Sequence, residues 1–421
     1  MNAEISNRRF PEAGLSRDEL AEAMAAARQD DLVWNDLKNI RASYDAGDDV
    51  IAVANEAFLS HIGDNVIYRG SAYPSLKRYE DEVIEMMLEL FNAPEGAGGS
   101  LTIGGTESLI MAVKAARDWA RATKPDVTTP EIVVPRTAHP AFNKAAELLG
   151  LSVVRIADSP DNRADVTAMD AAVTNNTIMI VGSAPPYPFG LVDPIPAISE
   201  IAERHGLWLH VDACLGGFIL PFARELGTEM PGFDFLVPGV RSLSADLHKY
   251  GWSGRGVSAL LLRDAALKEY QRFSFDEWPA GTYETDNIAG SRNGGAVASA
   301  WAVMRYLGHA GYRDRVAKML DIKQALRDGI HATGALHVLG EPEGAHFSIA
   351  SDALDIVAVG DGMAERGWLM ARTSEPASLT IQLNPRHDQI VEPFLADLGA
   401  VVDGVRDGSI VRSSGDAVYI S

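Results

Sequence analysis

Short apolar runs alternate with segments of helical periodicity through the middle of the chain. Runs with the length and composition of buried strands occupy residues 131–135, 152–156, 177–183, 207–212, 239–245 and 257–262. Segments with apolar residues at helical spacing lie between the first four runs, at residues 141–149, 166–173 and 195–205. Buried strands that alternate with helices predict an α/β fold with a mainly parallel sheet.

Three helices are predicted before this alternation begins. Ser16 and Glu19 have the spacing of a capping box, which predicts a helix over residues 17–28. Residues 76–91 place their apolar side chains on one helical face. A glycine-rich stretch at residues 96–99 then leads to a third predicted helix over residues 107–123.

The pattern changes near Tyr312. A long helix is predicted at residues 313–333, and it is followed by shorter strands and helices at residues 346–350, 356–367, 379–383 and 392–407. This order predicts a small C-terminal α+β domain. We therefore expect an N-terminal helical segment (residues 1–60), a large domain (61–311) and a small domain (312–421).

Composition and charge narrow the function. The 421 residues include 37 Lys and Arg against 58 Asp and Glu, a formal net charge of −21, which argues against a nucleic-acid partner. The single cysteine, Cys214, excludes an internal disulfide and a Cys-rich zinc site, and no histidine spacing predicts a metal. No apolar run reaches the roughly 18 residues of a membrane span. We expect a cytoplasmic protein without a membrane anchor.

Lys249 is the first candidate for chemistry. It lies in Ser-Ala-Asp-Leu-His-Lys-Tyr-Gly (residues 244–251), directly after a predicted strand. A lysine amine can form an imine with the aldehyde of a cofactor, and the preceding His248 can donate to a cofactor phosphate. A lysine at a strand end can also be simply solvated, so the neighbouring signals decide the interpretation.

Asp212 ends another predicted strand, within His-Val-Asp-Ala. A carboxylate at the end of a buried strand is costly without a partner, and a protonated pyridine nitrogen is such a partner. An N-cap, or a buried aspartate satisfied by backbone groups, is the alternative. Asp212 and Lys249 are predicted at strand ends of one sheet, where open α/β folds bind ligands.

Two further signals flank these residues. Gly104, Gly105 and Thr106 open a helix whose free N–H groups can bind a phosphate, and the segment lacks the lysine of a P-loop. His139 follows a strand and starts a helix, where its imidazole can lie flat on an aromatic ring. Together these residues predict a site for pyridoxal 5'-phosphate.

The same ordered residues resemble the fold-type I pyridoxal-phosphate enzymes of the group II decarboxylase superfamily, and within it the sphingosine-1-phosphate lyases. The resemblance covers about residues 44–312 and continues more weakly to the C-terminus. It is carried by GGTESLIMA (104–112), HPAFNKAA (139–146), HVDACLGGFIL (210–220), SLSADLHKYG (242–251) and AGSRNGG (289–295). It implies an aspartate aminotransferase-like large domain with a mainly parallel sheet.

The resemblance also implies roles for the candidate residues. Lys249 would hold the cofactor covalently, Asp212 would pair with its ring nitrogen, and His139 would stack on the ring. The phosphate would be bound by Gly105, Thr106 and His248 and, from the partner subunit of a homodimer, by Gly290 and Ser291. Ser291 could equally be a simple loop residue.

The segment Ser183–Pro194 separates two reactions on this scaffold. Its Ser-x-Pro, Pro-x-Gly and Asp-Pro steps, together with Cys214, resemble the lyases rather than the amino-acid decarboxylases. We therefore expect an aldehyde-lyase, which cleaves a carbon–carbon bond of a phosphorylated amino alcohol and releases an aldehyde and an amine. An amino-acid decarboxylase (carboxy-lyase) is the alternative. Lys249 and Tyr250 are both candidates for the base, and Tyr250 could instead only pack beside the lysine.

Three residues are implied at the small-molecule substrate. Tyr44 matches a tyrosine of the lyase family, Tyr68 falls on or near a histidine, and Arg255 replaces a lysine and can bind phosphate in a bidentate way. Phe189 also replaces a family histidine. Sphingosine 1-phosphate, a smaller phosphorylated amino alcohol and a β-hydroxy amino acid are therefore all compatible. A degenerate binding protein is disfavoured, because Lys249 and its predicted cofactor partners are all present.

Overall fold

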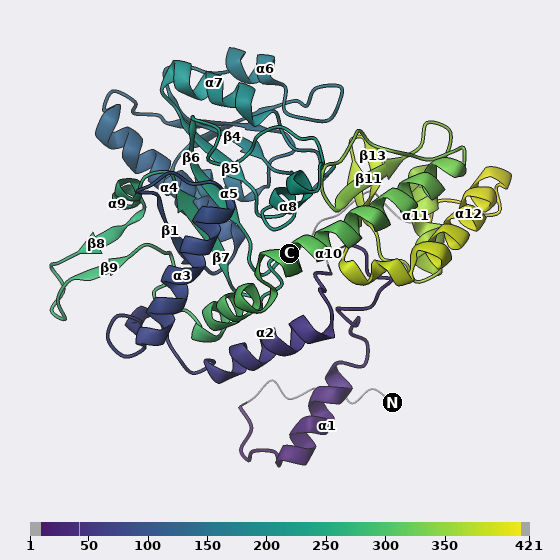
Figure 1. The fold of residues 1–421 in the computed structure, drawn as a ribbon, viewed down its shortest axis with the longest axis horizontal. Helices are drawn as coiled ribbons and strands as arrows, with labels where there is room; N and C mark the ends of the chain where they lie inside the picture. Colours follow the sequence, from purple (N-terminus) through teal and green to yellow (C-terminus); the bar gives the residue numbers. More distant parts are fainter. Residues whose placement is uncertain (1–9, 42, 414–421) are drawn as a thin grey trace. The chain divides into compact units, whose positions relative to one another are not determined.

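A computed structural model describes residues 10–41 and 43–413 (Figure 1). The chain divides into two compact units, the first ending at Asp36 and the second beginning at Leu37. The first unit contains α1 (Arg17–Ala27), and the predicted capping box is present, because Ser16 Oγ accepts from Glu19 N and the Glu19 carboxylate accepts from Ser16 N. The predicted domain limits stay predictions, and residues 1–9 and 414–421 lie outside the described part of the chain.

The second unit is built on a seven-stranded sheet in the order β1-β7-β6-β5-β4-β2-β3. Its strands are β1 (Gly98–Thr102), β2 (Glu131–Pro135), β3 (Ser152–Ile156), β4 (Thr177–Ser183), β5 (Trp208–Asp212), β6 (Val240–Ala245) and β7 (Ser258–Leu262). Five neighbouring strands, β3, β2, β4, β5 and β6, pair in parallel. By contrast, β7 is antiparallel to both β6 and β1. The predicted mainly parallel sheet is confirmed.

Helices cover both faces of this sheet (Figure 1). They are α3 (Pro74–Leu90), α4 (Gly105–Thr123), α5 (Ala141–Leu149), α6 (Val166–Ala171), α7 (Ile195–His205) and α8 (Leu220–Glu225). Because side chains alternate along a strand, Ile132 and Val134 of β2 pack with α4 and α5, while Val133 belongs to the opposite core. Burial on both faces explains why these strands read as continuous apolar runs.

A second, smaller sheet follows in the chain, as expected for an α+β domain. Its antiparallel strands have the order β10 (His337–Val338), β11 (His346–Ala350), β13 (Ala377–Gln382) and β12 (Ala371–Ser374). The helices α11 (Ile356–Glu365) and α12 (Val391–Asp407) accompany it (Figure 1). The long helix is α10 (Gly294–Ala332), which packs along α2 (Asp48–Ser60) and is interrupted at Gly308. It begins earlier than predicted and contains the predicted domain boundary at residue 312.

The remaining elements are short. A hairpin of β8 (Phe273–Phe275) and β9 (Tyr283–Thr285) follows α9 (Lys268–Gln271), and the 3-10 turns are η1 (Val66–Tyr68), η2 (Ala265–Leu267) and η3 (Pro385–Gln389). Within the described ranges, none of the helices combines the length and the apolar character that crossing a membrane requires.

Candidate active site

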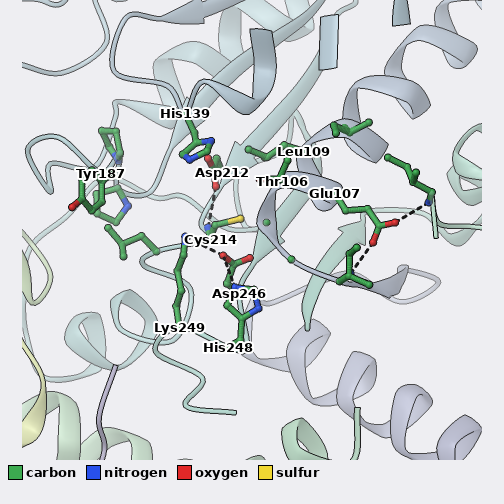
Figure 2. Close-up of a pocket in the computed structure, with 18 of the residues that line it drawn as sticks. Thr106, Glu107, Leu109, His139, Tyr187, Asp212, Cys214, Asp246, His248 and Lys249 are labelled. Carbon is green, nitrogen blue, oxygen red and sulfur yellow. Dashed lines mark hydrogen bonds and ion pairs between the residues drawn. The ribbon is translucent and has the colours of Figure 1, made fainter. Parts of the chain in front are cut away.

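A cavity of about 510 Å³ opens at the carboxyl ends of the central strands (Figure 2). Asp212 is the last residue of β5, Asp246 comes directly after β6, and the start of α4 faces them. Open α/β sheets bind ligands at this edge. The residues that line the cavity include six predicted site residues, namely Gly105, Thr106, His139, Asp212, His248 and Lys249.

Lys249 forms an ion pair inside the cavity. Its Nζ lies 3.0 Å from Asp246 Oδ2, and three quarters of its side chain is buried. Burial is the largest single influence and opposes the positive charge, but the nearby acidic groups, with the Asp246 carboxylate first among them, together raise the pKa of Lys249 well above its usual range. The amine is therefore held as an ammonium at neutral pH.

Asp212 keeps one carboxylate oxygen available. Its Oδ1 accepts from Cys214 N at 3.0 Å and from Ser244 Oγ at 3.4 Å. Among the described residues, no hydrogen bond uses Oδ2. A buried carboxylate with one free oxygen is suited to a cationic N–H donor from a ligand.

The start of α4 forms a cradle that side chains cannot fill. A Cβ on residue 105 would lie 2.8 and 2.9 Å from the two Asp246 oxygens and 3.0 Å from Cys214 Sγ. A side chain at this position would therefore displace Asp246 or Cys214, and with glycine the first N–H groups of the helix are open to an anion. His248 accepts from Val257 N through Nδ1 at 3.2 Å, which leaves its Nε2 proton for the cavity.

His139 has a fixed orientation beside Asp212 (Figure 2). Its Nδ1 accepts from Ala141 N at 3.1 Å, at the start of α5. Burial lowers the pKa of His139, so the ring is neutral. A neutral, oriented imidazole on the cavity wall is suited to stacking on a flat ligand.

Four other predicted residues do not line the cavity. Tyr250 is 1% exposed, and its hydroxyl donates to the Leu383 carbonyl at 2.9 Å. Tyr44 packs edge-on against Tyr250. The Arg255 guanidinium lies over the Tyr44 ring, 5.2 Å from the centre of that ring. Tyr68 is 55% exposed in η1. The structure thus brings Tyr44, Tyr250 and Arg255 together and leaves Tyr68 outside both groups.

Gly290 and Ser291 follow two residues of the cavity wall. Ile288 and Ala289 line the cavity, whereas Gly290 borders a second, smaller hollow of about 160 Å³. The Ser291 hydroxyl accepts from Asn65 Nδ2 at 3.0 Å. Within the described part of this chain, neither residue reaches the phosphate cradle, and their binding role stays a prediction.

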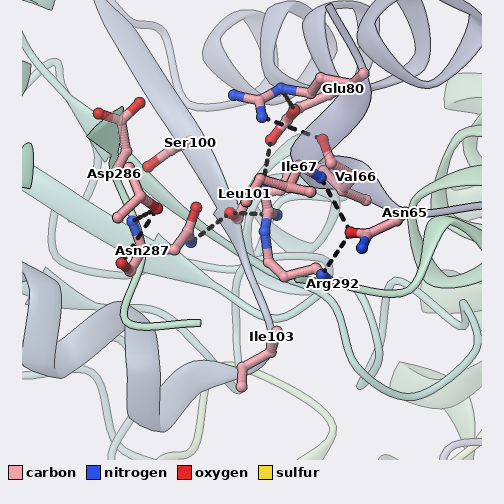
Figure 3. Close-up of polar contacts among 12 residues, drawn as sticks. Asn65, Val66, Ile67, Glu80, Ser100, Leu101, Ile103, Asp286, Asn287 and Arg292 are labelled. Carbon is pink, nitrogen blue, oxygen red and sulfur yellow. Dashed lines mark hydrogen bonds and ion pairs between the residues drawn. The ribbon is translucent and has the colours of Figure 1, made fainter. Parts of the chain in front are cut away.

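The loop that carries these residues is anchored at both ends. Asn287 Nδ2 and the Arg292 guanidinium each donate to the Leu101 carbonyl of β1 at 2.9 Å (Figure 3). The buried Glu107 carboxylate accepts from Ile288 N at 2.8 Å, and also from the neighbouring Ala289 N. The cavity wall at residues 288–289 is therefore fixed to both β1 and α4.

Three residues at the cavity are functional candidates that sequence reasoning missed. They are Glu107, Asp246 and Tyr187, and all three line the cavity. Asp246 could have been found as an acid three residues before Lys249 at the same strand end. Glu107 reads from sequence as an ordinary acid in the first turn of a helix, and nothing local marks Tyr187.

These residues fit one kind of ligand. The amine of Lys249, the free oxygen of Asp212, the flat His139 ring and the glycine cradle suit a phosphorylated aromatic aldehyde with a protonated ring nitrogen. The fold and the cavity define a pyridoxal-phosphate-dependent enzyme of fold-type I.

The family is shown by direct comparison. The family model described as "Pyridoxal-dependent decarboxylase conserved domain" matches residues 4–348. The chain belongs to this family, whose cofactor is pyridoxal phosphate.

Its relatives include several lyases. The chain is 40% identical over 339 residues to a sphingosine-1-phosphate lyase of Arabidopsis thaliana, covering 79% of this chain and 62% of that protein. It is 35% identical over 414 residues to the lyase of Dictyostelium discoideum, covering 97% and 77%. It is also 35% identical to a probable L-tyrosine/L-aspartate decarboxylase of Methanothermobacter thermautotrophicus, covering 81% and 91%. The matched region thus spans less than two thirds of the Arabidopsis protein.

Solved structures give the same result. A sphingosine-1-phosphate lyase of Burkholderia pseudomallei superposes with a TM-score of 0.90 at 36% identity, covering 97% of this chain and 95% of that one. A glutamate decarboxylase of Lactobacillus brevis has a TM-score of 0.82 at 21% identity, covering 97% of both chains, and shows the fold alone.

Proposed function

We propose that this protein is a pyridoxal-phosphate-dependent carbon–carbon lyase. It would cleave a phosphorylated amino alcohol, such as sphingosine 1-phosphate, or a related hydroxy-amine, to an aldehyde and an amine. The observation that carries the proposal is the single cavity in which Lys249, Asp212 and His139 face the glycine cradle of α4. The similarity to sphingosine-1-phosphate lyases over nearly the whole chain supports the lyase reaction.

Lys249, Asp212 and His139 each have a task in this reaction. The bound cofactor supplies an electron-withdrawing ring that accepts the electron pair left by the broken bond. Asp212 would hold a proton on the ring nitrogen through its free oxygen, and His139 would stack on the ring. Lys249 would hold the cofactor through its aldehyde, and its amine could also move a proton. Because the Tyr250 hydroxyl donates to the Leu383 carbonyl, we favour Lys249 as the base.

Tyr44 and Arg255 are proposed to contact the substrate phosphate. Gln382 Nε2 donates to the Tyr44 hydroxyl at 2.8 Å, so the Tyr44 proton remains for another acceptor. The Arg255 side chain is exposed above the Tyr44 ring and carries five donors that suit a phosphate. Among the residues that the structure describes, no contact of Tyr68 supports its predicted part in this group.

We also propose a homodimer with shared active sites. The anchored loop at residues 287–292 supports this arrangement, because it holds Gly290 and Ser291 away from the cradle of their own chain. In a dimer these residues would complete the phosphate site of the partner. A cytoplasmic location is proposed from the sequence composition alone.

Amino-acid decarboxylation is the second candidate. The decarboxylase relative from Methanothermobacter supports it, and the cofactor-holding residues would serve either reaction. The segment Ser183–Pro194, with its lyase-like spacing of proline and glycine, favours carbon–carbon cleavage.

Product analysis distinguishes the two reactions. The holoenzyme is incubated with sphingosine 1-phosphate, with a short phosphorylated amino alcohol, and with tyrosine, aspartate and glutamate. We expect aldehyde from a phosphorylated substrate and none from the Lys249→Ala variant. Release of CO₂ from an amino acid, without aldehyde, would overturn the lyase assignment. Arg255→Ala should raise KM strongly, and an unchanged KM would show that the phosphate is bound elsewhere.

A further inference from the structure

Asp246 is a buried carboxylate in the cavity to which the proposed reaction gives no task. It follows β6 directly and is 2% exposed. It lines the cavity between the glycine cradle and Lys249 (Figure 2). A carboxylate taken out of water at this depth is costly unless a positive group compensates it.

Its two oxygens have different surroundings. Oδ2 lies 3.0 Å from Lys249 Nζ and 3.7 Å from His248 Nε2. Oδ1 is buried and, within residues 10–41 and 43–413, has no hydrogen-bond partner. Both oxygens lie beside Gly105, 2.8 and 2.9 Å from where a Cβ on that residue would be, and the first free N–H groups of α4 at this point are predicted to hold a phosphate. Asp246 therefore contacts the amine and the phosphate cradle at once.

Asp246 is the dominant counter-charge of Lys249. Among the described carboxylates, it alone lies within ion-pair distance of the amine. Asp212 also faces Lys249, but its Oδ1 is occupied by Cys214 N. Tyr44 and Cys214 face the amine too, and burial raises the pKa of both, so both are neutral at pH 7.

The positive groups around Lys249 are weak or distant. Burial lowers the pKa of His248 and of His139, so both rings are neutral at pH 7. Arg255 is exposed and lies over the Tyr44 ring. Burial also lowers the pKa of His346, which faces Lys249 from β11, to about 4. None of these groups replaces Asp246 in setting the charge of the amine.

We propose that Asp246 is a positioning residue that holds the Lys249 ammonium in the cofactor-free cavity and takes up its proton when the cofactor aldehyde is captured. The inference deepens the proposed function and rests on Lys249 as the residue that binds the aldehyde. The ammonium gives one proton to the Asp246 carboxylate, and the neutral nitrogen attacks the aldehyde carbon. The two remaining amine hydrogens leave with the aldehyde oxygen as water, and a carbon–nitrogen double bond remains.

This transfer removes a conflict of charges. The phosphate of the cofactor would arrive at the start of α4, against which an ionised Asp246 is packed. Two anions at such a distance repel each other in a buried site. Once protonated by Lys249, Asp246 is neutral, and its buried Oδ1 no longer opposes the phosphate. Covalent capture and phosphate binding thereby favour each other.

The test measures Lys249 in the cofactor-free protein. The chain is treated with a limiting amount of acetic anhydride between pH 6 and pH 11, and acetylation of Lys249 is followed by peptide mass spectrometry. In the native chain the midpoint should lie above that of an ordinary lysine. In Asp246→Asn it should fall by about one pH unit or more, which is about tenfold faster labelling near neutral pH.

Asp118→Asn is the matched control. Asp118 pairs with Lys114 at 2.9 Å on α4 and does not line the cavity, so this variant should leave the Lys249 midpoint unchanged. As an independent readout, inorganic phosphate should bind cofactor-free Asp246→Asn more tightly than the native chain in a calorimetric titration.

The outcomes are decisive. Equal Lys249 midpoints in the native chain and in Asp246→Asn would overturn the proposal, and so would weaker phosphate binding by the variant. If Asp246→Asn does not fold, the native profile alone decides, because a midpoint at or below that of an ordinary lysine contradicts the ion pair. Labelling needs no turnover, so a failure of the proposed lyase activity would leave this result unaffected.

Discussion

Tyr250→Phe separates the two roles that its position next to Lys249 allows. In the structure its hydroxyl donates to the Leu383 carbonyl at 2.9 Å, and the side chain is 1% exposed. The substitution removes this hydrogen bond and keeps the ring. A typical hydrogen bond contributes about 0.5–1.5 kcal/mol, and a buried carbonyl left without a donor costs about 1–3 kcal/mol. We therefore expect the free energy of unfolding to fall by about 1–3 kcal/mol.

We expect Tyr250→Phe to leave kcat nearly unchanged, whereas loss of a catalytic base would lower it strongly. Loss of a general base costs about 10²–10⁴-fold in rate. A tyrosine that only anchors the chain leaves kcat within a few-fold of the native value. The two quantities are measured on the same preparation, by denaturant unfolding and by aldehyde formation with the holoenzyme at saturating substrate.

Tyr312→Phe is the matched control for this experiment. Tyr312 is 3% exposed, and its hydroxyl donates to the Gly251 carbonyl, also at 2.9 Å. It should lose a similar free energy of unfolding with no effect on kcat. A fall in kcat of more than about 100-fold in Tyr250→Phe, with unchanged stability, would refute the anchoring role and restore Tyr250 as the base.

Three further predictions concern the cavity wall and the pH dependence of stability. The two Glu107 carboxylate oxygens accept from the backbone N–H groups of residues 103, 288 and 289, and Glu107→Gln replaces one of these oxygens by an amide group. Limited proteolysis after residue 286 should therefore become faster, and equal rates would show that Glu107 does not anchor the loop. Gly190 has a φ of +73°, and in Gly190→Ala the new Cβ would lie 2.0 Å from the His346 carbonyl oxygen, so the free energy of unfolding should fall by more than about 2 kcal/mol in denaturant unfolding. Gly150→Ala is the control: its φ is +72° but a Cβ there meets no atom within 4 Å, so it should cost only about 1 kcal/mol. Burial lowers the pKa of His387 to about 4, so the unfolded chain binds a proton that the folded chain does not, and stability is lost as pH falls from about 6.5 towards 4. His387→Gln should reduce that slope by up to about 1.4 kcal/mol per pH unit in unfolding titrations, and an unchanged slope would show that His387 is already charged.

The central strands could be predicted because their burial on both faces leaves a local pattern. The predictions for β2 and β4 agree with the observed bounds at both ends, and the chemistry lies at the strand ends that follow. Asp212 and Lys249 were found because each lies at or soon after the end of such a run, where a charged residue is conspicuous. The glycine cradle was found from its position at a helix start.

Other parts depend on contacts that sequence does not reveal. β1 was missed because it contains Gly98 and Gly99, which weaken a strand pattern. A Cβ at residue 99 would lie 2.9 Å from the Leu260 carbonyl of β7, so the glycine serves a close approach between strands. Tyr250 was placed near the chemistry by its sequence position, whereas its side chain turns to Leu383. Which way a side chain turns is decided by tertiary packing.

The loop at residues 287–292 has a thermodynamic consequence. Asn287 and Arg292 converge on one carbonyl of β1, and Glu107 binds two backbone N–H groups between them. The loop is thus preorganised when the chain folds. Ordering a flexible side chain during association costs about 0.5–1.5 kcal/mol, and here that entropy is already lost before any partner or ligand arrives. In the proposed dimer, this loop would therefore contribute to assembly without a further ordering cost.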